Sequence, residues 1–164
     1  MTGSIVQINI SRGGLPKYPI AEGVVTPLGI EGDSHNNPRF HGGPMRALLL
    51  ICSEAIDALT AQGYRLFPGA MGENVTTRGI DHRQMRTGQR YRIGEAVIEL
   101  TQVRVPCIAL DVYGPSIKQE IYDQQVKAGD PSTGRWAMSG FYSSVVRAGT
   151  IRAGDPIALL DQAV

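Results

Sequence analysis

The sequence predicts a β-rich α+β protein, a closed or half-closed β-barrel with a few peripheral helices. Short stretches of strand-forming residues recur along the chain between turns rich in its 20 glycines and 10 prolines. Only two segments have the composition and boundaries of helices. A length of 164 residues fits one domain, so we expect a single domain over residues 1–164.

The strands are predicted from apolar periodicity. Val6, Ile8 and Ile10 alternate with polar residues and predict a half-buried first strand over 4–10. A glycine-rich segment, 11–43, follows, with one short strand expected inside it; a connection of this length is usually functional. The remaining strands are expected at 23–26, 46–51, 89–93, 96–103, 143–147 and 156–160.

Two helices are predicted from their boundary residues. Ser53 is a good N-cap for a helix over 54–62, and Gly63 follows as a stop. Pro115 suits the first position of a second helix that runs to about residue 127. Two further stretches, 88–98 and 149–159, resemble each other, because in each a strand enters a Gly-acid turn and a second strand follows.

Composition excludes several classes of protein. Hydrophobic residues make up 42% of the chain and the net charge is +1, which argues against disorder and against a nucleic-acid surface. The longest apolar run, Ala47–Cys52, has six residues, whereas a membrane span needs roughly 20. The N-terminus has no signal-peptide pattern, so we expect a cytoplasmic protein with no membrane or nucleic-acid partner.

The first candidate cluster lies near the end of the glycine-rich segment. Asp33, His35 and His41 fall within nine residues and suit metal ligation or acid-base work, although both residue types are also common in turns. Gly42 and Gly43 follow His41 and suit a close approach of the backbone to an anion or a planar ligand.

A second cluster, 68–74, has glycines on both sides of its central residues. Those glycines allow a tight turn that aims the Glu73 carboxylate and the Asn74 amide into a cleft; the alternative is a plain turn.

The third cluster contains Arg104, Pro106 and Cys107. A nearby guanidinium favours the thiolate, so Cys107 suits a nucleophile, a sulfur carrier or a soft-metal ligand; the alternative is an inert buried cysteine. Two cysteines make no disulfide framework, and Cys52, at the end of an apolar run, is expected to be buried and inert.

Basic residues in the loops are enough to hold a phosphorylated ligand, and we expect two or three of them to do so. They are Arg12, Lys17, Arg39, Arg104 and Arg135. No phosphate-loop motif, dinucleotide-binding fingerprint or nucleophile elbow is present in the sequence.

Taken in order, these clusters resemble a stand-alone MOSC domain, the type found at the C-terminus of molybdenum cofactor sulfurases. The resemblance spans nearly the whole chain and rests on segments 11–17, 32–35, 41–47, 68–74, 106–107 and 149–159. Related stand-alone proteins often have a proline where this chain has Val103 and a lysine where it has Ala109.

The resemblance implies a β-barrel with a cleft for a molybdopterin-type cofactor. It implies that Cys107 is the functional cysteine, either as a molybdenum ligand in an oxidoreductase that reduces N-hydroxylated compounds or as a persulfide carrier for metal-sulfur centres. No pyridoxal phosphate is expected, because the chain is too short for the pyridoxal-phosphate domain of the fused sulfurases.

On this basis we expect the molybdenum cofactor across one rim of the barrel. Cys107 is the expected metal ligand and, with Glu73, the expected catalytic group. The expected cofactor-binding residues are Arg12, Lys17, Asp33, His41, Gly42, Gly43, Asn74 and Arg104. A small-molecule substrate and a partner protein that donates electrons or sulfur complete the enzyme hypothesis. A non-catalytic carrier of sulfur or cofactor, or a barrel that binds another ligand without thiol chemistry, remain the alternatives.

Overall fold

The computed structural model describes residues 1–36, 39 and 41–160. In this part of the chain, seven strands close into a barrel in the order β11-β7-β8-β9-β5-β6-β1, with β1 pairing back onto β11. The prediction of a β-rich barrel with few helices is therefore confirmed. The barrel strands are β1 (Thr2–Ile10), β5 (Leu48–Cys52), β6 (Val75–Arg78), β7 (Arg90–Ile93), β8 (Ala96–Val103), β9 (Phe141–Arg147) and β11 (Pro156–Leu159).

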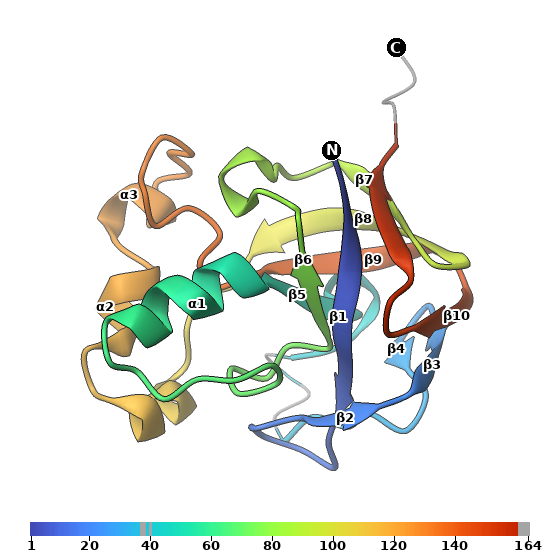
Figure 1. The fold of residues 1–164 in the computed structure, drawn as a ribbon, viewed down its shortest axis with the longest axis horizontal. Helices are drawn as coiled ribbons and strands as arrows, with labels where there is room; N and C mark the ends of the chain where they lie inside the picture. The colour runs from blue at the N-terminus through green and yellow to red at the C-terminus, as the bar shows by residue number, and fades with distance from the viewer. Residues whose placement is uncertain (37–38, 40, 161–164) are drawn as a thin grey trace.

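Four further strands lie outside the barrel. β2 (Tyr18–Ile20) adds to β1, and β3 (Glu22–Thr26), β4 (Gly29–Ile30) and β10 (Gly149–Arg152) form a separate sheet in the order β10-β3-β4. Figure 1 shows this small sheet at the side of the barrel opposite the α-helices. The segment 11–43 thus contains two short strands, β2 and β4, beyond the one predicted.

The helices pack on one side of the barrel (Figure 1). These are α1 (Ser53–Ala61), α2 (Ile117–Ile121) and α3 (Gln124–Lys127). The chain also has 3-10 segments elsewhere: single-turn η1 (Pro44–Arg46) and η2 (His82–Gln84), and a longer one, η3 (Ile108–Tyr113). None of the helices that the structure describes is both long and apolar enough to span a membrane.

The helix predicted over 54–62 forms as α1, but the prediction of Ser53 as its N-cap is wrong. Strand β5 runs directly into α1, so Cys52 occupies the N-cap position and Ser53 is already helical. The Ser53 hydroxyl is buried and makes no hydrogen bond. Gly63 does follow the helix, with a φ of 101° that a glycine adopts without strain.

The single helix predicted over 115–127 is also wrong, since the structure has two short helices there. Tyr122 is extended, with φ −157° and ψ 121°, and interrupts the helix. Asp123 then caps α3 by accepting a hydrogen bond of 2.8 Å from the Val126 amide. An aspartate in this position stabilises a new helix start better than a helix interior, so the chain restarts rather than continues.

Strand β5 separates two apolar clusters, and this explains its uninterrupted apolar sequence. All five of its residues are buried. Leu48 and Leu50 face the barrel interior, while Ile51 packs with Ile56 and Ile117 under the helices. The strand begins at Leu48 and not at residue 46 as predicted, because Pro44–Arg46 form a 3-10 turn after Gly43.

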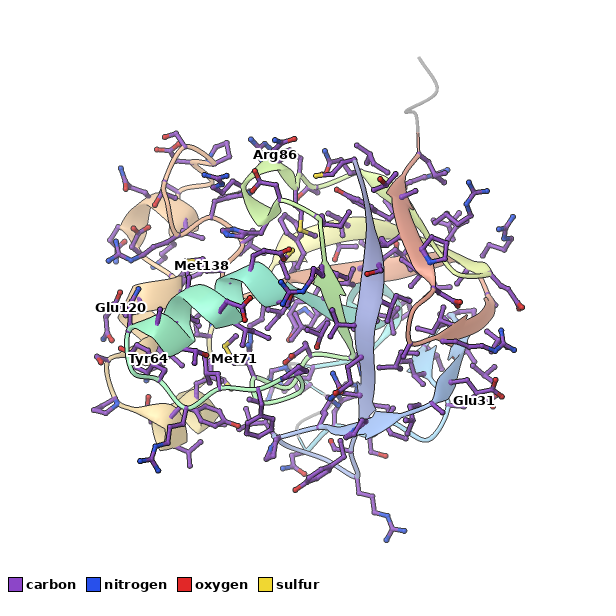
Figure 2. The ribbon with its side chains drawn as sticks, viewed as in Figure 1. Glu31, Tyr64, Met71, Arg86, Glu120 and Met138 are labelled. Carbon is purple, nitrogen blue, oxygen red and sulfur yellow. The ribbon has the colours of Figure 1, made fainter. Side chains whose placement is uncertain are left out.

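Strand β6 lies beside β5 in parallel and was not predicted. Leu50 is opposite Val75, and α1 together with the loop over 62–74 connects the two strands. Met71 belongs to this loop and packs in the cluster under α1; Figure 2 labels it below that helix. This crossover fixes the second predicted cluster, 68–74, against the end of the barrel.

Candidate functional site

A cavity of about 240 Å³ opens at the end of the barrel where four loops meet. The loops precede β2, precede β5, precede β6 and follow β8. Its lining residues are Gly14, Leu15, Lys17, Ser34, His35, Asn36, His41, Arg46, Leu49, Met71, Gly72, Asn74, Arg104, Cys107, Ile108, Ala109 and Tyr142. Five of the sequence-predicted site residues therefore line one cavity: Lys17, His41, Asn74, Arg104 and Cys107.

Lys17 and Asp33 form a buried ion pair at this cavity. Lys17 Nζ lies 2.6 Å from Asp33 Oδ1, and the two side chains are only 6% and 4% exposed. Asn74 Nδ2 donates to Asp33 Oδ2 at 2.8 Å, and the Ser11 amide donates to Oδ1 at 2.9 Å. Asp33 thus connects three loops. Its negative charge is balanced within the protein by Lys17.

Arg104 is a second buried cation in the lining, at 2% exposure. Its guanidinium donates to the carbonyl oxygens of Met71 at 2.9 Å and Ser139 at 3.4 Å, and its buried Nε has no hydrogen-bond partner. Among the described residues no carboxylate lies within ion-pair distance of it. A buried guanidinium without a carboxylate in ion-pair contact is costly, so this arrangement favours an anionic ligand.

Tyr142 and His41 form a hydrogen-bonded pair in the same wall. The Tyr142 hydroxyl lies 2.9 Å from His41 Nδ1, and the Arg46 guanidinium sits 5.7 Å from the centre of the Tyr142 ring. Burial lowers the pKa of His41, and nearby cations, Arg104 first among them, lower it further. Burial likewise raises the pKa of Tyr142. Near neutral pH both groups are therefore uncharged hydrogen-bonding partners.

The two cysteines differ as predicted in exposure. Cys107 is partly exposed, lines the cavity and occupies the N-cap position of η3. Cys52 is buried in the core with its sulfur 3.8 Å from Met85 Sδ, and burial raises the pKa of its thiol to about 12. A thiol in that environment is inert. Chemistry at a cysteine is therefore confined to Cys107.

Glu73 does not reach the cavity, although the loop forms the predicted tight turn. Gly69 and Gly72 have φ values of 92° and 85°, and a Cβ on Gly69 would lie 2.2 Å from the Lys17 carbonyl oxygen. This turn presents Asn74 to the cavity but points Glu73 inward, where it is 0% exposed. Burial raises the pKa of Glu73, against hydrogen bonds from the Gly69 amide and the Thr76 hydroxyl.

Arg12 is exposed, and neither it nor Gly42 or Gly43 is among the lining residues, so their predicted roles stay predictions. Gly42 packs so closely on His35 that a Cβ there would lie 2.7 Å from the imidazole Cδ2. Arg135 is also outside the cavity and pairs with Glu120 and Asp123. Residues 37, 38 and 40, which separate His35 from His41 in the predicted segment 11–43, lie outside the described residues.

Sequence reasoning missed Arg46 and Tyr142 as site residues. Arg46 follows the His41-Gly42-Gly43 motif almost directly, so its position was a usable signal. Tyr142 had none, because it reaches the site through the pairing of β9 with β5, in which Leu49 is opposite Tyr142. Both of these paired residues line the cavity.

No three His, Cys, Asp or Glu side chains in the described structure come together to hold a metal ion. In the first cluster, Asp33 is already ion-paired with Lys17. His35 Nε2 lies 4.0 Å from Asp33 Oδ2. Burial lowers the pKa of His35, so this contact is not an ion pair at neutral pH. Cys107 remains the one thiol that lines the cavity in the described residues.

Comparison with curated proteins finds relatives of similar sequence. The chain is 31% identical over 143 residues to protein YiiM of Escherichia coli, which covers 85% of this chain and 59% of that protein. It is 30% identical over 134 residues to the uncharacterized protein YflK of Bacillus subtilis, with 80% and 56% covered. This chain thus spans between half and two thirds of the length of either relative.

Solved structures share the fold. YiiM from Geobacillus stearothermophilus superposes with a TM-score of 0.71 at 25% identity, over 97% of this chain and 75% of that one. The YUAD protein from Bacillus subtilis gives a TM-score of 0.68 at 21% identity, over 96% and 94%. The sequence matches the family model of the MOSC domain over residues 37–158. The chain therefore belongs to the MOSC domain family.

Proposed function

We propose that this protein binds the molybdenum cofactor in the cavity and reduces N-hydroxylated or N-oxygenated compounds, with Cys107 as the molybdenum ligand. One observation carries the proposal: the cavity holds a partly exposed thiol together with Arg104, a buried guanidinium that has no carboxylate partner in the described structure. A soft donor beside a cation that has no ion-pair partner suits a ligand that brings both a soft metal and a phosphate.

The donor set of this cavity fits such a group. The described side chains offer no cluster that would hold a bare metal ion, so a metal at Cys107 must arrive with ligands of its own. The molybdenum cofactor would have this property, because its organic part would bring ligands to the metal. Apolar side chains, among them Leu49 and Met71, complete the lining and suit a flat ring system.

The residues of the chain divide into three roles. Arg104, Arg46 and Lys17 supply positive charge for the phosphate, and Lys17 is held in place by Asp33. His41 offers a hydrogen bond to the pterin, and Asn74 Oδ1, which already accepts from the Leu49 amide, can accept one more. Arg12, Gly42 and Gly43 would act from outside the lining. Cys107 holds the metal. Glu73, fully buried, acts on the ligand only through other residues.

The proposed reaction is balanced by an external reductant. An N-hydroxylated compound takes up two electrons and two protons, its N–O bond breaks, and the amine and water leave. The cofactor, when bound, supplies the two-electron redox chemistry. The electrons come from a redox partner protein, and the cavity residues bind and orient the substrate near Cys107.

Metal and pterin content tests the proposal. The protein is purified anaerobically from a host that makes the cofactor, beside Cys107→Ser and the matched thiol control Cys52→Ala. We expect about one molybdenum per chain in the wild type and in Cys52→Ala, and its loss in Cys107→Ser, since a hydroxyl is a poor ligand for this soft site. Equal metal in all three proteins, or none in the wild type, would overturn the assignment of Cys107.

A sulfur carrier is the second candidate, favoured by the exposed surface around the thiol. Ile108 and Val112 are 78% and 74% exposed, and Val105 is 59% exposed, so apolar side chains flank Cys107 and suit contact with a donor protein. This function requires one persulfide on Cys107 and no substrate turnover. Mass spectrometry of the protein after incubation with a persulfide donor distinguishes it from the oxidoreductase.

A further inference from the structure

Glu73 and Arg104 are two buried ionisable groups that each have a polar atom without a hydrogen-bond partner. Glu73 is 0% exposed and Arg104 is 2% exposed. Glu73 Oε2 and Arg104 Nε are both buried, and neither has a hydrogen-bond partner. Unsatisfied buried atoms on two groups of opposite charge call for a physical explanation.

The two groups hold the same loop from opposite ends without touching. Arg104 Nη2 donates to the Met71 carbonyl at 2.9 Å, and Glu73 Oε1 accepts from the Gly69 amide at 2.6 Å. No ion pair within 4.0 Å joins them in the described structure. Arg104 lines the cavity and Glu73 does not, so a ligand reaches the guanidinium but not the carboxyl group.

We propose that the Glu73 carboxylate balances the charge of Arg104 in the empty cavity, and that Glu73 takes up a proton when an anion binds beside Arg104. The reason is the cost of unbalanced charge in a poorly solvated site: one cation there supports one anionic group better than two. This inference rests on the proposed function only because it takes this cavity as the ligand site. It predicts that the protein takes up a proton when an anion binds.

The groups around Glu73 determine whether anion binding strengthens or weakens as the pH falls. The charged or titratable side chains that act on it in the described structure are Arg104, after β8, and Tyr113, in η3. Its other partners, the Gly69 amide and the Thr76 hydroxyl, are neutral. Burial raises the pKa of Glu73 and the charge of Arg104 opposes this. An anion beside Arg104 weakens the effect of the guanidinium charge on Glu73. The pKa of Glu73 then rises further, so anion binding strengthens as pH falls.

Sulfate is the probe, because it does not titrate between pH 5 and 9 and any proton taken up must come to the protein. The full chain, prepared without cofactor, is titrated with sulfate at constant ionic strength in two buffers of different ionisation enthalpy. The difference in measured heat gives the number of protons taken up per sulfate. Glu73→Gln is the matched variant, since glutamine keeps an oxygen for Gly69 and Thr76 but carries no charge.

We expect the wild type to take up more protons than Glu73→Gln, by up to one per sulfate, and its affinity to rise by up to about tenfold per pH unit as pH falls. Glu73→Gln should bind sulfate more tightly than the wild type above the transition, because no carboxylate competes for Arg104. A purely structural role of Glu73 predicts the opposite sign, weaker binding in the variant. His35 and His41 titrate in both proteins and cancel in the comparison.

Equal proton uptake in the two proteins, weaker binding in Glu73→Gln, or no sulfate binding to either would overturn the inference. If Glu73→Gln fails to fold, Thr76→Val replaces it: loss of the Thr76 hydroxyl bond to Glu73 should move the binding transition to higher pH, and an unmoved transition counts against the role. Cofactor content, measured separately, separates this result from failure of the proposed function, since a protein that keeps molybdenum but shows no proton uptake overturns the inference alone.

Discussion

Lys17 and Arg104 are both buried cations in the lining of one cavity, but their surroundings differ. Lys17 is 2.6 Å from Asp33, which also accepts hydrogen bonds from Asn74 and Ser11. Arg104 rests on backbone carbonyl oxygens and has no carboxylate within ion-pair distance in the described structure. The paired cation holds the loops of the wall in place, whereas the unpaired cation leaves its charge available to a ligand.

The largest expected effect on stability comes from removing Asp33, the ion-pair partner of Lys17. Asp33→Ala leaves Lys17 as a buried charge without a carboxylate partner and removes the acceptor of two further hydrogen bonds. We expect the free energy of unfolding to fall by about 3–5 kcal/mol, as measured by denaturant unfolding.

Asp57→Ala is its control, because Asp57 pairs with Arg78 on the surface, where the side chains are 63% and 54% exposed. That variant should lose about 1 kcal/mol or less. Equal losses in the two variants would show that the pair at Lys17 is not a structural element of the wall.

Removal of the unpaired cation should affect binding more than stability. Arg104→Met eliminates the charge and should weaken sulfate binding by about 10- to 100-fold, the value of one charge-assisted hydrogen bond, while destabilising the protein less than Asp33→Ala. Calorimetric titration measures the affinity. Arg135→Met, which removes a cation paired with Asp123 outside the cavity, should bind like the wild type. An unchanged affinity in Arg104→Met would contradict the distinction between the two cations.

A smaller loss is expected at the neutral pair in the same wall. Tyr142→Phe removes the hydrogen bond to His41 but keeps the ring under Arg46, and should cost about 1 kcal/mol of unfolding free energy. Tyr64→Phe is the control, since its hydroxyl bonds Ser116 at an exposed position and should cost less. Thermal unfolding of both variants checks the difference, and a larger loss in Tyr64→Phe would contradict it.

The smallest effect is expected from pH, because His35 and His41 are only partly buried. The pKa of each is lowered in the folded protein, mainly by burial, so the unfolded chain binds more protons near pH 6.5. Their contribution to stability is present above about pH 6.5 and is lost as pH falls through their lowered pKa values. Unfolding free energies between pH 5 and 8 should therefore show a shallower slope in His41→Asn than in the wild type, and an identical slope would exclude the effect.

Local pattern predicted the elements whose partners lie nearby. The alternation in β1 and the strands β7 and β8, a hairpin paired from Arg90 opposite Glu99 to Ile93 opposite Ala96, could be identified from sequence alone. The stretches 88–98 and 149–159 look alike, yet the second makes no hairpin: β10 pairs with β3, and β11 pairs with β1 and β7. Pairing between distant segments has no local signal, so similar patterns adopted different roles.

The candidate site likewise contains residues that local sequence could locate and residues that it could not. The loop clusters around Lys17, Asn74 and Cys107 could be found as motifs and do line one cavity. Tyr142 could not, since it arrives through strand pairing, and the inward orientation of Glu73 follows from the turn at Gly69 packing against the Lys17 backbone. Sequence motifs located the loops, while the direction of each side chain was decided by contacts between segments far apart in the chain.

The closure of the barrel by β1 and β11 has a consequence for how the protein folds. Thr2 pairs with Ala158 and Ser4 with Pro156, and the Leu159 amide donates to the Met1 carbonyl at 2.9 Å. These contacts join residues more than 150 positions apart, so β1 can pair with β2 and β6 early but its contact with β11 must wait until β11 has been synthesised. Contacts of such long sequence separation slow folding, because the loop entropy is lost before the strands gain their hydrogen bonds. On a ribosome, the barrel around this cavity closes only after β11 has left the exit tunnel.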